Sequence, residues 1–256
     1  ITDFFKPFFS GIFLETQLET SSRMFEFVYK MFGEGQATLP KAGIEAIPKQ
    51  LLTNLKTTSF RYNTKVESLK DGEITLKDGT KLKSHYTIVA TEASGLISNL
   101  KQQSTAWKSC VTLYFETNSR VIDQKLIGLI PKSGAFINNV FYNTSLETDT
   151  DPQNELLSVT VIDTQGLSNA SLIEAVKTEL NECCGITATN FIKLYNIPKA
   201  LPKLRDLKYE MTPSETRLTD SLFLAGDTQL NASLNAAMIS GERAALGVIA
   251  SINTAI

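Results

Sequence analysis

A segment near the C-terminus, SLFLAGDTQLNASLNAAMISGERAALGVIA, constrains the fold more than any other part of the sequence. Ser221–Ala225 has the apolar character of a short buried strand, Gly226-Asp227 forms a turn, and a helix follows from about Ala232 to Asn253. The free N–H groups and positive dipole end at the start of this helix can receive an anionic edge of a ligand. An ordinary strand–turn–helix unit that binds nothing is the plainer alternative. Small residues allow the helix to pack closely on a neighbour: Ala236, Ala237, Ser240, Gly241, Ala244 and Ala245.

Composition excludes several functional classes. The 256 residues carry a net charge of −2, which leaves no electrostatic footprint for binding nucleic acid. No apolar run reaches the roughly 18 residues expected of a membrane-spanning helix. Three cysteines and the single histidine, His85, predict neither a disulfide framework nor a metal site, and they favour a reducing, cytoplasmic compartment. No G-x-S-x-G pattern of a serine hydrolase accompanies His85.

Helices precede strands in the first hundred residues. A cap among residues 20–22 predicts a helix to about Phe32, and a second helix follows Gly43 to about Lys56. Asp-Gly pairs at 71–72 and 78–79 are strong hairpin signals, because glycine accepts a positive φ. Glu92–Asn99 is interpreted as a short helix. The predicted strands are Phe60–Asn63, Lys65–Leu69, Glu73–Lys77 and Lys81–Ala90, the last ending as a buried strand.

The middle of the chain is rich in β-forming residues separated by polar loops. A helix that opens at Asn169 or Ser171 runs to about Cys184, where Gly185 ends it. The whole pattern predicts a mixed α/β fold with a mostly antiparallel sheet flanked by helices. The predicted strands of this sheet are Trp107–Glu116, Leu126–Ile130, Ala135–Tyr142, Leu156–Asp163 and Phe191–Tyr195.

Several segments, taken in order, resemble the superfamily of flavin-containing amine oxidases, phytoene desaturases and protoporphyrinogen oxidases. LAGD followed by ASLNAAMISGERAA is similar to its last FAD-contacting motif. FRYNTKVESL with ITLKDGTKLKSHYTIVATEAS is similar to the strand pair that re-enters its FAD domain, and LYNIPKALP to a late strand of its substrate domain. PFFSGIFLETQLETSSRMFEFVYKMFGEGQATLPKAGIEAIPKQL resembles the segment before its second cofactor-contacting strand. The resemblance covers nearly the whole chain, although Ala232 and Ala236 stand where relatives often have glycine.

The resemblance implies FAD as the cofactor and gives roles to matching residues. Val66 matches the position whose backbone meets the adenine. Ala90 and Thr91 match the segment that runs past the dinucleotide. Gly226 and Asp227 match the pair that contacts the pyrophosphate and the ribityl chain.

Further matching residues concern the flavin edge and the substrate. Leu234 matches the helix-start residue whose backbone N–H meets the pyrimidine edge of the flavin, and Ser233, Asn235 and Ala237 lie beside it. Tyr195 matches a position that often lines the substrate cavity, although core packing is its plainer interpretation. No catalytic acid or base can be named, and no metal is implied.

The same resemblance divides the chain into four parts. Residues 1–59 are expected to be a helical segment that packs on the other domains, and residues 60–95 part of the FAD-binding domain. Residues 96–219 would form the substrate domain, and residues 220–256 the last FAD-contacting strand and helix. The implied reaction moves a hydride from a C–H bond of a small apolar or amine substrate to the flavin.

One element of such folds is absent from the sequence. Dinucleotide sites use G-x-G-x-x-G between a first strand and helix, and no such pattern occurs here. Because the first residue is Ile1, we interpret the chain as the C-terminal portion of a longer oxidoreductase, without FAD and inactive when it lacks its N-terminal FAD-binding half.

Two other functions stay open. The first is a desaturase or isomerase that acts on a polyisoprenoid or tetrapyrrole at a membrane surface, and the second is a non-catalytic binding module. Five phenylalanines in the first thirteen residues suit an apolar substrate, a peripheral membrane contact or packing on the missing half. An exposed former interface would also favour self-association.

We predict that the purified 256-residue chain is colourless. Contacts through Val66, Thr91 and Leu234 would be chiefly backbone hydrogen bonds worth about 1 kcal/mol each. Their sum must offset several kcal/mol of lost ligand freedom, without a glycine-rich turn to receive the pyrophosphate. Visible absorbance of the purified protein measures the bound flavin, and a yellow preparation with stoichiometric flavin would contradict the prediction.

Overall fold

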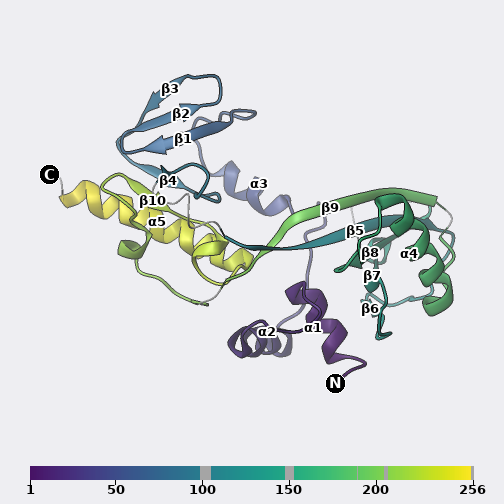
Figure 1. The fold of residues 1–256 in the computed structure, drawn as a ribbon. Helices are drawn as coiled ribbons and strands as arrows, with labels where there is room; N and C mark the ends of the chain where they lie inside the picture. The colour runs from purple at the N-terminus through teal and green to yellow at the C-terminus, as the bar shows by residue number, and fades with distance from the viewer. Residues whose placement is uncertain (99–104, 148–152, 189, 205–206, 255–256) are drawn as a thin grey trace. The chain divides into compact units, whose positions relative to one another are not determined.

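The computed structural model describes residues 1–98, 105–147, 153–188, 190–204 and 207–254 (Figure 1). The chain divides into two compact units. Unit 1 comprises residues 1–57 and 108–201, and unit 2 comprises residues 58–107 and 202–256. Helices and antiparallel sheets are both present, so the predicted mixed α/β fold is confirmed. The assignment of FAD and substrate domains stays a prediction.

Unit 1 is built on a five-stranded sheet with the strand order β6-β7-β8-β5-β9. β8 (Glu155–Val161) lies at its centre and pairs antiparallel with both β7 (Ile137–Tyr142) and β5 (Trp107–Thr117). The edges are β6 (Gly128–Leu129) and β9 (Asn190–Pro202). An edge strand can carry Pro198 and Pro202, because it needs no outward N–H, and β9 therefore extends beyond the predicted end at Tyr195.

One face of this sheet is covered by α4 (Asn169–Cys184), as Figure 1 shows. The Ser168 side chain caps the first turn of α4, and Gly185, with a φ of 63°, ends the helix as predicted. Strand side chains alternate between faces, so Thr112 and Tyr114 lie on the face opposite α4, here called the open face, which α1 covers in part at β7. The core between sheet and helix contains Val111, Leu113, Phe115, Val140, Leu157, Val159, Leu172, Val176 and Leu180.

A buried carboxylate joins α4 to the start of β7. Glu179 is only 7% exposed, and its Oε2 accepts hydrogen bonds from the backbone N–H groups of Phe136 (3.0 Å) and Ile137 (2.8 Å). Buried polar groups need such partners, and two donors satisfy this oxygen. The contact fixes the entry of the chain into β7.

The N-terminal helices of unit 1 share a small aromatic core. α1 (Phe5–Phe13) and α2 (Ser22–Glu34) bury Phe9, Phe13 and Val28 against each other. Ser21 caps α2, in agreement with the predicted start of that helix. A third helix, α3 (Ala46–Thr53), ends three residues before its predicted limit and has no buried side chain.

Gly11 allows α1 to approach β7 closely. A Cβ added at Gly11 would clash with Asn138 Oδ1. The amide Nδ2 of Asn138 also donates to the carbonyl oxygen of Pro7 at 3.0 Å. Helix and strand are therefore held together by a polar contact at short range.

Unit 2 opens with a three-stranded antiparallel sheet. Its strands are β1 (Val66–Lys70), β2 (Glu73–Leu76) and β3 (Lys81–Lys83), joined by the two predicted Asp-Gly turns. Asp71 in the first turn accepts hydrogen bonds from Thr219 Oγ1 (2.5 Å) and from Ser221 Oγ (2.6 Å) and N (3.0 Å). Hydrogen bonds from Ser221 and then Thr219 hold the pKa of Asp71 below its ordinary value.

The C-terminal helix of unit 2, α5 (Leu234–Thr254), packs closely on β10 (Leu222–Leu224). Gly247 makes this approach feasible, because an added Cβ would lie 2.9 Å from Pro213 O and 3.0 Å from Phe223 Cε1. The sequence pattern had singled out Gly241 instead, which has open space around it.

Three predicted elements are wrong. Phe60–Asn63 is not a strand, because Asn63 adopts a left-handed φ of 54° and the segment is exposed. Lys81–Ala90 splits into β3 and β4 (Thr87–Val89), which join different sheets, and Ile88 of β4 is 40% exposed rather than buried. The helix predicted over Glu92–Asn99 is not formed over most of its length: residues 94–96 make a turn, Ile97 makes an isolated bridge to Leu69, and the Glu92 side chain accepts the Ser94 N–H. Ser98 has 3-10 conformation, and Asn99 lies outside the described residues.

Within the described ranges, none of the helices combines the length and the apolar character needed to cross a bilayer.

Replacing Gly247 by alanine should lower the free energy of unfolding by about 1–2 kcal/mol, because the added methyl overpacks the contact with β10. The matched control is Gly241→Ala in the same helix. It meets no atom within 4 Å, and it should stabilise the protein by up to about 1 kcal/mol through helix propensity alone. Urea denaturation of both variants measures the difference, and equal effects at the two positions would argue against the close approach.

Candidate functional site

The carboxyl ends of two parallel strands meet at one edge of unit 2. β4 and β10 are in register, and the pairing continues where the Ala225 N–H donates to Val89 O at 3.0 Å. In open α/β sheets, ligands bind just beyond such carboxyl ends. Four of the predicted cofactor residues follow the two strands directly: Ala90, Thr91, Gly226 and Asp227.

Gly226 has a backbone conformation that only glycine adopts readily. Its φ of 129° and ψ of 165° lie outside the regions open to residues with a Cβ. The Gly226 N–H donates to Ser240 Oγ at 2.8 Å, and the Ser240 hydroxyl lies 2.9 Å from the Gly226 carbonyl oxygen. The Gly226 N–H is thus used inside the protein, and Gly226 would serve a ligand through close approach of its Cα rather than through a donor.

Asp227 is half-buried at the start of the 3-10 helix η4 (Asp227–Gln229). Its backbone oxygen accepts from the N–H groups of Leu230 (3.2 Å) and Ala232 (3.0 Å). Among the described residues, no donor reaches its carboxylate. The side chain is therefore available to accept hydrogen bonds from a ligand.

The start of α5 presents two free backbone donors. Ser233 caps the helix, since its Oγ accepts from the Ala236 N–H at 3.0 Å, and the Ala237 N–H donates to Ser233 O at 3.1 Å. In the part of the chain that the structure describes, the N–H groups of Leu234 and Asn235 have no acceptor. These are the orphan donors of a helix N-terminus, where the dipole favours negative charge.

The turn before α5 contains a backbone conformation that glycine would adopt at lower cost. Ala232 has a φ of 62°, in the left-handed region, which costs about 1 kcal/mol for a residue with a Cβ. Asn231, 5% exposed, supports this turn: its Nδ2 donates to Lys208 O at 3.2 Å, and its Oδ1 accepts from Ser233 Oγ at 2.7 Å. Glycine would adopt this φ without that cost, which explains why relatives often have glycine where this chain has Ala232.

Val66 lies beside the same strand pair. Its side chain packs on an apolar cluster of Leu69, Val89, Ile97 and Leu222, which also supports β4 and β10. With Val66 included, all nine predicted cofactor residues belong to unit 2.

Tyr195 belongs to β9 of unit 1, where it is 47% exposed. Its ring meets that of Tyr114 edge to face, with centroids 5.9 Å apart, and the Lys193 ammonium lies 5.0 Å from its centroid. Tyr114 stands opposite Ser158, which in turn stands opposite Phe141. The sequence analysis missed Tyr114 and Phe141, which the register places with Tyr195 in one row on the open face of the sheet.

A partly buried ion pair was also missed. Lys108 and Glu15 are each 12% exposed, with Nζ and Oε2 2.5 Å apart. Lys108 Nζ also donates to Thr20 Oγ1 at 2.8 Å, and the Thr20 N–H donates to Glu15 Oε1 at 2.7 Å. This cluster ties the segment after α1 to β5. Only their separation of 93 residues hid the pair from sequence reasoning.

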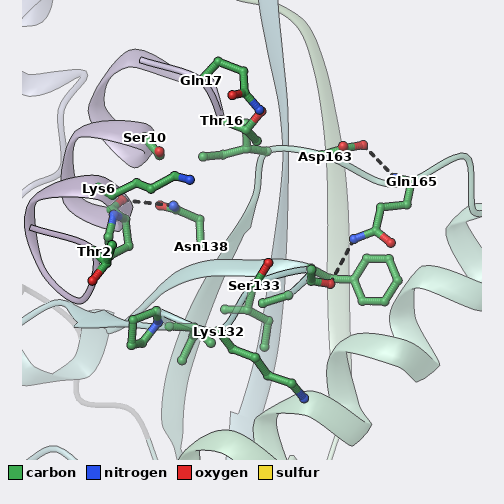
Figure 2. Close-up of a pocket in the computed structure, with 18 residues that line it drawn as sticks. Thr2, Lys6, Ser10, Thr16, Gln17, Lys132, Ser133, Asn138, Asp163 and Gln165 are labelled. Atoms are coloured by element: carbon green, nitrogen blue, oxygen red, sulfur yellow. Dashed lines mark hydrogen bonds between the residues drawn. The ribbon is translucent and has the colours of Figure 1, made fainter.

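Two cavities of the structure lie in unit 1, and no predicted site residue lines either. One, of about 440 Å³, lies between α1, the loop before β7 and the segment after β8 (Figure 2). The other, of about 480 Å³, is mainly apolar and is lined by Phe5, Phe9, Phe13, Leu18 and Phe25 among others.

Residues 1–249 match the sequence pattern of the family described as flavin containing amine oxidoreductase. Among curated proteins, none matches the sequence.

Several solved structures share the fold. An oxidoreductase from Methanosarcina mazei gives a TM-score of 0.68 at 15% identity, over 91% of this chain and 61% of that one. A fatty acid isomerase from P. acnes, described as CLA-producing, gives 0.60 at 10% identity, over 90% and 56%. A putrescine oxidase variant from a redesign of cofactor binding gives 0.58 at 13% identity, over 81% and 53%. The chain thus spans between half and two thirds of the length of these structures.

The partly buried pair makes the stability of unit 1 depend on pH. Burial raises the pKa of Glu15, but hydrogen bonds from Lys108 and Thr20 lower it more, so the net pKa lies below the ordinary 4.5. A lowered folded pKa means that the pair stabilises the protein above about pH 4.5 and loses that contribution as the pH falls through the folded pKa.

Glu15→Gln leaves the Lys108 ammonium without its carboxylate and should cost about 1–3 kcal/mol near pH 7. The difference in unfolding free energy between the parent and this variant, measured by urea denaturation from pH 7 to pH 3, should shrink at the acid end. A difference that stays constant over that range would refute the assignment.

Proposed function

The chain belongs to the family of flavin-containing amine oxidoreductases, and we propose on this premise that unit 2 supplies part of an FAD site and unit 1 a wall of the substrate cavity. We propose that the full-length protein is an oxidoreductase. When bound, FAD would supply the acceptor for a hydride from a substrate C–H bond. The residues of this chain would bind and orient the cofactor and the substrate, and would exclude water from the reacting atoms.

One observation carries the proposal: ligand-accessible groups converge at the carboxyl ends of β4 and β10. The backbone conformation of Gly226 keeps a side chain out of this edge, and the Asp227 carboxylate beside it has no partner among the described residues. The free N–H groups of Leu234 and Asn235 begin a helix of 21 residues. An acceptor for hydroxyls next to donors for an electron-rich edge fits the ribityl and flavin parts of FAD.

We assign each group one task. Asp227 accepts a hydrogen bond from a ligand hydroxyl, and Leu234 and Asn235 donate to the pyrimidine edge. Val66 supports the adenine end through β1, while Ala90 and Thr91 border the dinucleotide. Ser233 acts indirectly, since its hydroxyl caps α5 and orients the two donors.

The pyrophosphate contacts are proposed to lie outside these 256 residues. The sequence contains no G-x-G-x-x-G, and the Gly226 N–H is occupied by Ser240. We therefore propose that an N-terminal FAD-binding half completes the site, and that the 256-residue chain alone is without cofactor and inactive.

The proposed substrate has an apolar body. Tyr114, Tyr195 and Phe141 supply aromatic surface on the open face of the sheet. Of the carboxylates nearby, Glu116 accepts from Asn154 and Asn190, and Glu15 is paired with Lys108. The charge of Glu15 is thus compensated by Lys108, and both carboxylate oxygens of Glu116 already accept a hydrogen bond.

A second candidate is a desaturase or isomerase that takes a large apolar substrate at a membrane surface. It is favoured by aromatic side chains on α2 and just before α1, of which Phe4, Tyr29 and Phe32 are 55%, 58% and 52% exposed. Aromatic surface of this kind marks an interaction site for an apolar partner.

In the FAD-binding full-length protein, Asp227→Ala should weaken FAD binding by about 10- to 100-fold, since a hydrogen bond to a charged group is worth about 1.5–3 kcal/mol. Asp220→Ala is the control, because Asp220 lies before β10, at the other end of that strand, pairs with Arg217 at 3.0 Å and is solvent-exposed. Quenching of flavin fluorescence gives both dissociation constants. If Asp227→Ala binds FAD as tightly as the control does, Asp227 is not in the site.

Leu234 allows a test of a backbone donor. Leu234 is the first residue of α5, where proline is well tolerated, so Leu234→Pro removes the N–H without breaking the helix. We expect this variant to bind FAD several-fold more weakly, and Leu234→Ala, which keeps the N–H, to bind like the parent. The same titration measures both, and loss of affinity in the alanine variant alone would point to the side chain instead.

A further inference from the structure

The polar cavity of unit 1 is separate from the proposed cofactor residues. Its volume of about 440 Å³ lies within the range of about 300–1,000 Å³ that is typical of small-molecule sites. Figure 2 shows hydroxyl, amide and ammonium groups around it, contributed by α1, the loop after it, the β6–β7 hairpin and the segment after β8. Ile130, Phe136 and Ile162 supply apolar wall.

Lys6 supplies an uncompensated positive charge. Its side chain extends along the cavity in Figure 2, and none of the described residues forms an ion pair or hydrogen bond with its ammonium. Lys132 differs, since its ammonium points away in Figure 2 and lies 3.9 Å from Cys183 Sγ. The one carboxylate of the lining, Asp163, is drawn across the cavity from Lys6, and its Oδ1 accepts from the Gln165 N–H at 2.8 Å.

Ser10 supplies a hydroxyl at the wall of the cavity. It stands one helical turn after Lys6 on α1, so the two side chains share a face. Ser10 as a residue is only 6% exposed, and it lines the cavity; its Oγ is not among the fully buried atoms that lack a partner in the described residues. The hydroxyl is therefore available to hydrogen-bond to a ligand oxygen in the cavity.

The start of α1 strengthens the positive potential. The helix has no capping side chain and no acidic residue in its first turn, and Lys6 stands in that turn. A lysine beside the positive end of a helix dipole is unfavourable unless an anion offsets both.

We propose that this cavity binds a small organic molecule through an anionic group, a phosphate or a carboxylate. Lys6 pairs with the anion, Ser10 hydrogen-bonds to it, and the apolar wall holds the rest of the molecule. The proposal does not depend on FAD or on the proposed function, because all its residues belong to unit 1.

Three probes of similar size test it on the 256-residue protein: phenyl phosphate, benzoate and benzylamine. Titrations by saturation-transfer NMR should show saturable binding of at least one anion, and binding of benzylamine at least about tenfold weaker. The anion that binds more tightly identifies the anionic group, phosphate or carboxylate, that the cavity prefers. Absence of saturable anion binding, or equal binding of benzylamine, would overturn the proposal.

Variants locate the site. Lys6→Met should weaken binding of the anion about tenfold, and Lys6→Arg should keep it within about threefold of the parent. Ser10→Ala should weaken binding several-fold. Ser10 also separates this cavity from the apolar one, because Lys6 borders both and Ser10 borders only the first. Lys132→Met is the matched control and should bind like the parent; an equal loss in Lys132→Met and Lys6→Met would refute the site.

Discussion

The hydroxyl of Ser240 is the contact on which the architecture of unit 2 depends. It is fully buried, and it lies within hydrogen-bond distance of both the N–H and the carbonyl oxygen of Gly226. The contact fixes a backbone conformation that few residues can adopt, immediately after β10. It is possible only because Gly247, two turns further along the same helix, lets α5 lie close to that strand. The orientation of Asp227 and of the first donors of α5 follows from these two small residues.

Unit 1 rests on a different constraint, the alternation of side chains across its sheet. Residues that point toward α4 form a continuous apolar core, and their neighbours lie on the opposite face, where α1 packs on β7 only. Edge-to-face contact between Tyr114 and Tyr195 gives this second face an aromatic surface with polar rims. Strand register alone thereby places these rings on one face, and the composition of that face can change without disturbing the core behind it.

Sequence reasoning recovered most elements, because caps, glycines and hydrophobic periodicity are local signals. Ser21, Gly185 and the Asp-Gly turns were found in this way, and so was the strand–turn–helix unit at Gly226. What it missed depends on distant partners. The break between β3 and β4 reflects membership of two sheets, and the Glu15–Lys108 pair joins residues 93 positions apart. Spacing along the chain carries no signal for either.

Both units are assembled from two separated stretches of chain, which has a consequence for folding during synthesis. Asp71 finds its partners Thr219 and Ser221 148 to 150 residues later, and β4 pairs with β10 across a similar interval. At about 5–20 residues per second, a ribosome needs roughly 8–30 s to supply the second stretch. During that time the edge of β4 that pairs with β10 in the folded protein has no partner, and because an unpaired strand edge can pair with another chain, the risk of aggregation grows with the length of this delay.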